Sequence, residues 1–317
     1  MINLYKPEGM LIRTAENREY ITSLSGLERA MNEGRILEST VLLCDSAMRL
    51  HVDLYGIPGI IERNDAVYCR RGEEIKDIAV ITRVGKPICF KVTGFTKIQG
   101  ETVALLSRRA AQEECIRNYL SDLIPGDIVP AKVTHLENFG AFVDIGCGVA
   151  SLLSVDSISV SRISHPSDRL SVGDSVFTVI KAIDREQERI FVSMRELLGT
   201  WEENASFFEP GQTVAGIVRS IENYGVFIEL APNLAGLAEI REGSCDHNIA
   251  VVGQYAAVYI KNIIPERMKI KLVIIDGAKG CEPPSRLEYF IPQETEHIDL
   301  WRYSPESNSR IIETRFN

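Results

Sequence analysis

The sequence predicts an all-β protein made of tandem small barrels that short linker helices join. Two observations predict it. In the segment 131–145, apolar and polar residues alternate in runs rich in Val, Ile and Phe, as in strands with one buried face. The segment 217–240 then repeats the pattern of the segment 132–154 at a spacing of 85 residues (224 − 139 = 85). A period of that length holds a whole set of strands, so it indicates tandem domains.

Each copy carries a pair of aromatic residues beside a glycine. Phe139 and Phe142 flank Gly140 in the first copy, and Tyr224 and Phe227 take their places in the second. A glycine inside a strand marks a bulge, a sharp bend or a close backbone approach, so both rings can turn outward together. Two exposed rings on a small barrel form a stacking platform for unpaired bases.

Both copies resemble the S-one repeat, the OB-fold RNA-binding unit named after the largest protein of the small ribosomal subunit. The resemblance covers residues 125–276 and implies a five-stranded OB-fold barrel for each copy. The first copy departs from the family at Ser151, which replaces a glycine, and at Ser154, where the family often has a base-contacting histidine. The second copy has Glu239 at the histidine position and Ile264 in place of the closing aspartate. The residues of the first copy that match are Phe139-Gly140-Ala141-Phe142-Val143, Leu152, Val172-Gly173-Asp174, Asp184, Arg189 and Val192-Ser193.

Polar and basic residues around the rings complete the predicted interface. Asp184 is expected to accept a hydrogen bond from a base edge or to hold Arg189 in place, the alternative being a surface hairpin with incidental charges. Arg162, in the long loop 158–172, lies near the phosphate track or on a solvated loop. His165 in the same loop has a turn role. The candidate RNA contacts are Lys132, Phe139, Phe142, Ser154, Arg162, Lys181, Asp184 and Arg189 in the first copy, and Arg219, Tyr224, Phe227, Arg267 and Lys269 in the second.

The basic residues of the second copy are expected to form a stripe. Arg267, Lys269 and Lys271 alternate along the last strand of that copy, so they are predicted to project from one side of it. Such a stripe could follow an RNA backbone, although solvated strand faces show the same pattern.

A third, diverged repeat is expected to come first, at residues 36–109, after an N-terminal segment 1–35. A short helix is predicted at 25–34, with Ser25 as its N-cap and Gly34 as its end, plugging one end of the first barrel. Five strand-like runs follow, one of them IAVITRV at 78–84. Met48 and His51 stand where the ring pair stands elsewhere, which predicts a docking or spacer module. The family resemblance implies that this leading repeat contacts the small ribosomal subunit.

Linkers and an extension complete the predicted organisation. Helical linkers are expected at 110–124 and 198–209, the repeats at 125–197 and 210–276, and an aromatic-rich extension at 277–317. Trp201 is predicted to be a packing anchor at a joint. The extension is either two short strands folded onto the body or a surface that binds a partner or RNA.

The composition limits the function classes. The 317 residues carry a net charge of −9, which argues against an electrostatic duplex binder but permits modest, salt-sensitive single-strand binding. Seven irregularly spaced cysteines indicate reduced thiols in the cytoplasm. The sequence shows no signal peptide or membrane span, and no phosphate loop, nucleophile elbow or metalloprotease motif. Cys245-Asp246-His247 lacks a second ligand pair, so neither metal nor cofactor is expected.

The sequence therefore predicts a non-catalytic, cytoplasmic protein that binds single-stranded RNA, including mRNA, in or around translation on the small ribosomal subunit. Three alternatives stay open. Ser154, Glu239, Ile264 and the negative charge favour a protein-interaction scaffold. An accessory of RNA decay or transcription would use the same stacking face. An enzyme would need a site in residues 277–317, for which the sequence shows no chemistry.

Overall fold

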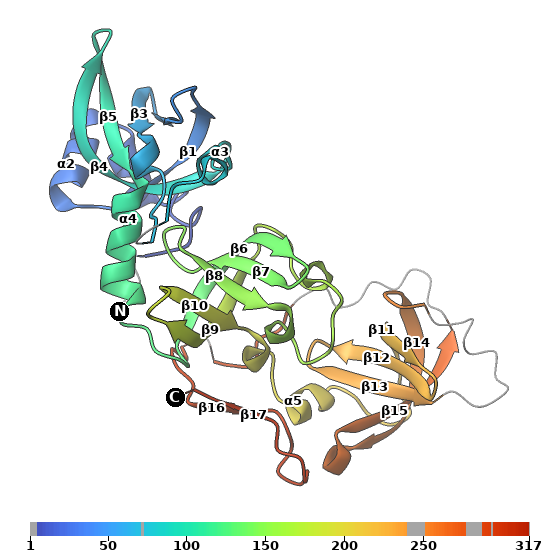
Figure 1. Cartoon of the computed structure of the whole chain (residues 1–317). Helices are drawn as coiled ribbons and strands as arrows, with labels where there is room; N and C mark the ends of the chain where they lie inside the picture. Colours follow the sequence, from blue (N-terminus) through green and yellow to red (C-terminus); the bar gives the residue numbers. More distant parts are fainter. Residues whose placement is uncertain (1–4, 71–72, 240–250, 277–286, 293, 317) are drawn as a thin grey trace.

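The computed structural model describes residues 5–70, 73–239, 251–276, 287–292 and 294–316, and its strands close into three five-stranded barrels (Figure 1). The barrels follow one another along the chain, and the view in Figure 1 shows them in a row. The strand orders are β1-β2-β3-β5-β4, β10-β8-β7-β6-β9 and β11-β12-β13-β15-β14. The predicted all-β class with three tandem OB-type barrels is therefore confirmed.

The first barrel has helices at its ends. Leu27 and Ala30 of the second helix are fully buried against the barrel core, so this helix plugs the barrel as predicted. The helix begins two residues earlier than expected, because the Ser23 hydroxyl, not that of Ser25, accepts the Gly26 N–H. The elements are α1 Ala15–Ile21, α2 Leu24–Glu33, β1 Leu37–Cys44, β2 Leu50–Leu54, β3 Ile57–Ile61, η1 Arg63–Asp65, α3 Asp77–Ile81, β4 Pro87–Ile98 and β5 Glu101–Ser107.

One expectation for this part of the chain is wrong, and one helix in it was not predicted. The run at 78–84 is not a strand, since α3 occupies most of it and only Val80 enters the core, while Ile78 and Ile81 stay exposed. Five other strands already close the barrel, so this apolar run has no free edge to pair with. The first helix, α1, was not predicted, although Thr14 caps it by accepting the Asn17 N–H.

The second and third barrels share one topology. Each closes through a parallel pair, β8 with β10 and β13 with β15, while the other pairs are antiparallel. The strands are β6 Ile128–Glu137, β7 Gly140–Asp144, β8 Ala150–Ser154, β9 Ser175–Asp184 and β10 Arg189–Ser193, then β11 Thr213–Glu222, β12 Gly225–Ala231, β13 Leu234–Glu239, β14 Tyr255–Ile264 and β15 Lys269–Asp276. Short helical turns are η3 Val155–Ser157, η4 Pro166–Asp168 and η7 Pro265–Arg267.

The two linkers are helical to different extents. The first is α4, Arg108–Cys115, which continues as the π-helical turn η2, Ile116–Leu120. The second was predicted as a helix at 198–209; the short turn η5, Arg195–Leu197, comes before that range, and α5, Trp201–Ala205, lies within it. Gly199 has φ +83 between them, and Thr200 begins the new helix with a capping box. Trp201 is 2% exposed and packs in the third core, as predicted.

A buried ion pair joins the first two barrels. Arg108 lies at the start of α4 and binds both carboxylate oxygens of Glu8, at 2.6 and 3.0 Å. The Glu8 N–H donates to Asp144 of the second barrel at 2.6 Å, and the Lys132 ammonium donates to the Glu8 carbonyl at 2.9 Å. A side chain at Gly148 would collide with the Arg108 guanidinium. The N-terminal segment is therefore clamped between the barrels.

Three buried cysteines meet at the same junction. Cys89 comes from the first barrel, Cys115 from α4 and Cys147 from the second barrel, and all three belong to one hydrophobic cluster. Burial raises the pKa of the Cys89 thiol, which also donates to the Cys147 carbonyl. Residues that look scattered in the sequence thus gather in one place, where they pack as apolar groups.

A second buried ion network joins the second and third barrels. Arg169, from the long loop of the second barrel, and Arg219, from β11, both bind the Glu229 carboxylate of β12. The three side chains are 6%, 9% and 4% exposed. Asn233 adds hydrogen bonds across this joint, accepting the Val160 N–H at 2.9 Å and donating to the Gly199 carbonyl at 2.9 Å.

The C-terminal extension folds back onto the body, one of the two predicted outcomes. Its strands β16, Leu300–Arg302, and β17, Glu313–Arg315, pair with each other. Trp301, Tyr303 and Phe316 are buried, and the Tyr303 hydroxyl donates to the Asn233 carbonyl at 2.7 Å. Glu296, which lies earlier in the extension, accepts the N–H of Ile128 of the second barrel at its carbonyl. The extension therefore contacts both later barrels.

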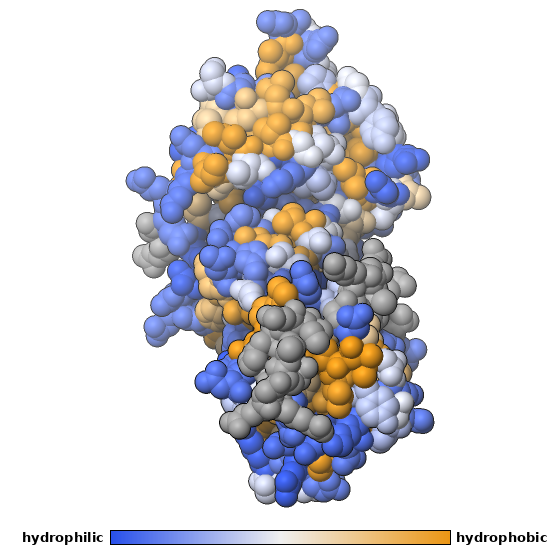
Figure 2. Space-filling model, turned by 90° about the vertical axis from the view of Figure 1, so that its right-hand side faces the viewer, coloured by the Kyte–Doolittle hydropathy of each residue, from blue (hydrophilic) through white to orange (hydrophobic). Residues whose placement is uncertain are grey.

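Within the described ranges, no helix has the length and apolar character needed to cross a bilayer. The apolar side chains at the surface gather chiefly over the first barrel, in the upper part of Figure 2. The exposed apolar side chains of β1 and α3 are Leu42, Leu43, Ile78 and Ile81, which are 48–63% exposed.

Removing the guanidinium of the first junction should destabilise the protein strongly. In Arg108→Ala, the Glu8 carboxylate stays buried without its partner, so we expect a loss of about 3–5 kcal/mol in unfolding free energy. Denaturant unfolding followed by circular dichroism measures it. Arg109→Ala is the matched control, since that side chain is 46% exposed and its loss should cost less than about 0.5 kcal/mol. Equal losses in both variants would contradict this role.

Stability should fall as the pH rises through neutrality. Burial raises the pKa of Glu38 to about 7 from its usual 4.5, although the Gly9, Ile12 and Leu11 N–H groups bind its carboxylate. Folding therefore favours the protonated form, and this stabilisation is complete below the unfolded pKa and lost as the pH passes the folded one.

Between about pH 5 and pH 8 we expect a loss of up to about 3 kcal/mol in wild type. Asp144, whose pKa burial also raises to about 7, adds a loss of the same sign. Glu38→Gln should flatten the slope of unfolding free energy against pH, and Glu28→Gln, an exposed control, should leave it unchanged. A Glu38→Gln slope equal to that of wild type would rule out this assignment.

Candidate nucleic-acid interface

Two glycines set the position of the ring-bearing strands. A Cβ on Gly140 would lie less than 3.0 Å from the Leu153 carbonyl oxygen, and one on Gly225 would lie 2.7 Å from the Ala238 carbonyl oxygen. Of the three roles that the sequence left open, the close backbone approach is the one observed. The irregular pairing lies in the neighbouring strand instead, between Val133 and His135 of β6.

The aromatic pairs lie at the surface of both barrels. The Phe139 ring is 56% exposed and meets the Phe142 ring edge-on, with centroids 6.1 Å apart and planes at 89°. The Tyr224 ring is 61% exposed and meets Phe227 in the same way, at 6.2 Å and 90°. Neither pair belongs to a barrel core. The geometry leaves ring faces available to planar ligands.

A third aromatic residue, Phe191, extends the face of the second barrel. Phe142 is opposite Leu152 across β7 and β8, and Leu152 is opposite Phe191 across the parallel pair of β8 and β10. All three side chains are half-buried. The local sequence pattern gives no signal for Phe191, because its place beside Leu152 depends on a parallel pairing between strands that are far apart in the chain.

Polar and charged groups border this row. The Ser154 hydroxyl donates to the Ser157 hydroxyl, which also accepts from the Lys181 ammonium, both at 2.9 Å. Ser154 itself lies opposite Gly140 across β7 and β8. Lys181 is therefore fixed at the end of the face that carries Phe139.

Asp184 and Arg189 lie opposite each other at the tip of the β9–β10 hairpin. The Asp184 carboxylate accepts the Gln187 N–H at 2.9 Å and so shapes the turn, while Arg189 is exposed. Arg189 shares a face of β10 with Phe191, two residues on. The hairpin thus places one free guanidinium along the ring row.

The third barrel has a cationic face. Lys269 and Lys271 of β15 occupy the places of Arg189 and Phe191, since Lys269 pairs with Ile264 and Lys271 with Leu237. The Lys271 ammonium lies 3.4 Å from the Glu239 carboxylate. The predicted stripe is wrong in one member, because Arg267 lies in the turn η7 and Met268 follows with φ 47, which breaks the alternation.

Two predicted contacts are engaged elsewhere. Lys132 binds the Glu8 carbonyl at the first junction, and Arg219 is 9% exposed in the second ion network. Neither joins the ring faces. Arg162 is exposed on its loop. His165 has the predicted turn role, since its Nδ1 accepts the Ser167 N–H at the start of η4.

The first barrel presents no ring pair at the corresponding place. Met48 lies in a turn with φ 63, and His51 hydrogen-bonds to Asp45 at 3.0 Å. This bond, and then the Arg49 N–H, lower the pKa of Asp45. The histidine and the carboxylate thus hold the β1–β2 turn together.

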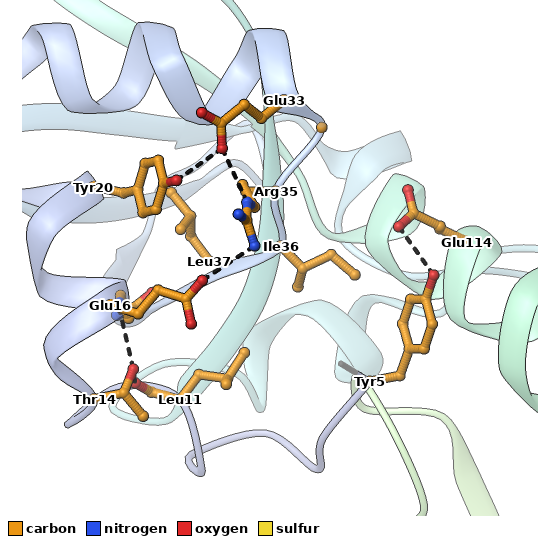
Figure 3. A pocket seen from close by; sticks show the side chains of 12 residues that line it. Tyr5, Leu11, Thr14, Glu16, Tyr20, Glu33, Arg35, Ile36, Leu37 and Glu114 are labelled. Atoms are coloured by element: carbon orange, nitrogen blue, oxygen red, sulfur yellow. Dashed lines mark hydrogen bonds and ion pairs between the residues drawn. The ribbon is translucent and has the colours of Figure 1, made fainter. Parts of the chain in front are cut away.

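The pocket in Figure 3 lies between α1, α2 and α4, and measures about 550 Å³. Its charged groups bind one another: Arg35 contacts both Glu16 and Glu33, and the Tyr20 hydroxyl donates to Glu33 (Figure 3). In the part of the chain that the structure describes, no three His, Cys, Asp or Glu side chains form a metal site. Cys245-Asp246-His247 lies outside the described residues.

The fold and the surface aromatic pairs define a class, tandem OB-fold proteins with an aromatic pair at the surface of two barrels. Residues 122–195 match the model of the S1 RNA binding domain. Small ribosomal subunit protein bS1 of Staphylococcus saprophyticus is 35% identical over 182 residues, or 54% of this chain and 46% of that protein. Its counterpart in Staphylococcus aureus strain COL is 35% identical over 180 residues, with the same coverage. Residues 122–195 thus resemble an S1 RNA binding domain, and the chain spans about half the length of these curated relatives.

Two solved structures also resemble parts of the chain. GSP13 of Bacillus subtilis is 30% identical and covers 23% of this chain and 57% of its own, with a TM-score of 0.23. A multidomain protein with nucleic acid binding domains from Streptococcus pneumoniae is 14% identical and covers 79% and 76%, with a TM-score of 0.24. Neither whole chain superposes on this one at such scores.

A methyl group at position 140 should disturb the second barrel. Gly140→Ala forces the new Cβ against the Leu153 backbone, so we expect a loss of about 1–3 kcal/mol in unfolding free energy. Gly94→Ala is the matched control in a strand, because its Cβ would meet only the Leu105 side chain, at 3.9 Å. Thermal unfolding compares the two, and a Gly140→Ala variant as stable as Gly94→Ala would contradict the close approach.

Proposed function

We propose that this protein binds single-stranded RNA, without catalysis, through the ring faces of its second and third barrels. The observation that carries the proposal is the edge-on aromatic pair at the surface, with one ring exposed and the other half-buried, which recurs in both barrels with nearly the same geometry. Exposed rings on an OB-type barrel stack unpaired bases irrespective of sequence, because every base has a π-face. The match of residues 122–195 to the S1 RNA binding domain supports the same ligand.

The two ring faces differ in how much stacking and how much charge they offer to RNA. On the second barrel, Phe139, Phe142 and Phe191 give an extended apolar row, and Lys181 and Arg189 border it. On the third barrel, Lys269 and Lys271 replace the arginine and the third ring, so phosphate attraction contributes more there. Because the chain has a net charge of −9, we expect modest affinity that falls as salt is added.

The biological setting follows from the curated relatives, which are proteins of the small ribosomal subunit. We propose that the chain acts on mRNA in or around translation, in the cytoplasm. In this scheme residues 125–197 and 210–276 are the RNA-binding units, and residues 36–109 are a docking module for the small subunit. The first barrel lacks a ring pair and carries the exposed apolar side chains visible in Figure 2, which suits contact with a protein surface.

Removing both rings of the second barrel should weaken RNA binding. For Phe139→Ala with Phe142→Ala, two stacked bases lose their platform, and we expect a loss of about 2–6 kcal/mol. Fluorescence titration with a short oligouridylate measures it at fixed low salt.

Phe207→Ala is the matched control, since this ring is 59% exposed but lies in the linker before the third barrel. It should leave the affinity within about a factor of two. An RNA affinity that is the same in the double variant and in wild type would refute the assignment of the second barrel.

A further inference from the structure

A groove on another side of the second barrel is lined by aromatic side chains and carboxylates. It measures about 880 Å³, and three parts of the chain form its walls: the N-terminal segment with the end of the linker helix, strands β6 and β9, and the C-terminal extension. In the barrel order, β6 and β9 lie next to each other, whereas the ring row runs over β7, β8 and β10. The groove is therefore distinct from the proposed RNA face.

Two aromatic pairs line the groove. Tyr5 and Tyr119 are stacked, with centroids 6.0 Å apart and planes at 16°. Phe177 and Tyr289 meet edge-on at 5.7 Å, and Phe177 is 47% exposed. The Tyr289 hydroxyl accepts the Phe177 N–H at 3.0 Å, which fixes the extension against β9. The C-terminal extension thus supplies a wall that a barrel alone does not have.

The charge of the groove has one sign. The described residues that line it include no Lys, Arg or His. Its charged side chains are the carboxylates of Asp122, Asp127, Glu288 and Glu296. Asp127 hydrogen-bonds to His297 at 2.7 Å, and the other three carboxylates are exposed. Phosphates would be repelled here, so a second strand of nucleic acid is a poor occupant.

We propose that this groove binds an extended, arginine-containing peptide segment of a partner protein. A guanidinium stacks on aromatic faces and pairs with carboxylates, and the groove offers both within one surface. Aromatic-lined grooves also accept extended, proline-containing peptides, which lose little conformational freedom on binding. The protein would then hold RNA on one side of its second barrel and a basic protein segment on another.

The test uses the full chain and a fluorescein-labelled peptide of four Arg-Pro repeats in an anisotropy titration. A peptide with Glu for Arg is the ligand control. Phe177→Ala should weaken binding of the Arg-Pro peptide at least about fivefold. Phe177→Leu, which keeps apolar packing against Tyr289 but removes the ring face, should weaken it comparably. Removing charge from the rim, with Asp122→Asn and Glu288→Gln together, should also weaken it about fivefold or more.

The matched control for charge is Glu202→Gln with Glu209→Gln, which removes the same two charges from exposed positions outside the groove. It should change the peptide affinity less than about twofold, and Phe177→Ala should change the oligouridylate affinity by no more. Equal effects of both charge variants would mean non-specific attraction and would overturn the proposal. So would a dissociation constant above about 1 mM for the wild type.

Two further results would also overturn it. A fall in RNA affinity in Phe177→Ala would make the groove part of a nucleic-acid surface. Tighter peptide binding after residues 277–286 are replaced by a Gly-Ser segment would assign the groove to the chain's own sequence instead of a partner. Because the groove variants spare the ring row, failure here leaves the RNA proposal standing, and loss of RNA binding in the ring variants leaves this one standing.

Discussion

The arrangement of the first two barrels depends on the buried ion pair between Arg108 and Glu8. Burial alone would raise the pKa of Glu8, but the Arg108 guanidinium lowers it, so both partners stay charged inside the protein. The cost of burying these charges is offset only in this geometry, with two parallel N–H···O bonds and the Glu8 N–H bound to Asp144. Because Arg108 also begins α4, one contact fixes the linker helix, the N-terminal segment and both barrels. The position of Tyr5 and Tyr119 in the groove follows from it.

The second junction is also held by buried ion pairs, but here two arginines share one glutamate. Two arginines, Arg169 and Arg219, share the Glu229 carboxylate, and Asp168 lies 3.4 Å from Arg219. Burial lowers the pKa of Arg169, and Glu229 counteracts this effect. These arginines are committed to holding barrels together, which leaves fewer cations for a ligand. Under the proposed function, this acidic chain must then rely on rings and on the few basic groups that remain exposed beside them.

Local patterns in the sequence predicted the barrels and their ring pairs, because strand alternation and a strand glycine act over a few residues. The junctions could not be predicted in this way. Lys132 looks like a free lysine until Glu8, 124 residues earlier in the chain, is placed against it. Arg219 looks like a phosphate contact until Glu229 and Arg169 surround it. Phe191 was missed for the same reason, since a parallel pairing brings it to Leu152. The helix α3 was mistaken for a strand because a short apolar run suits either structure.

Closing a five-stranded sheet gives each barrel several outward faces, and this chain uses them differently. On the second barrel, Gly140 lets β7 approach β8 closely, which leaves the rings of Phe139 and Phe142 outside and places Phe191 in line with them. On β9 of the same barrel, Phe177 also points outward, but the extension covers part of it through Tyr289 and surrounds it with carboxylates. Two aromatic surfaces of similar composition therefore differ in the charge beside them. Lys181 and Arg189 lie beside the ring row, and only carboxylates are among the charged residues that line the groove, so in the two proposals the neighbouring charge, rather than the rings themselves, separates the two kinds of ligand.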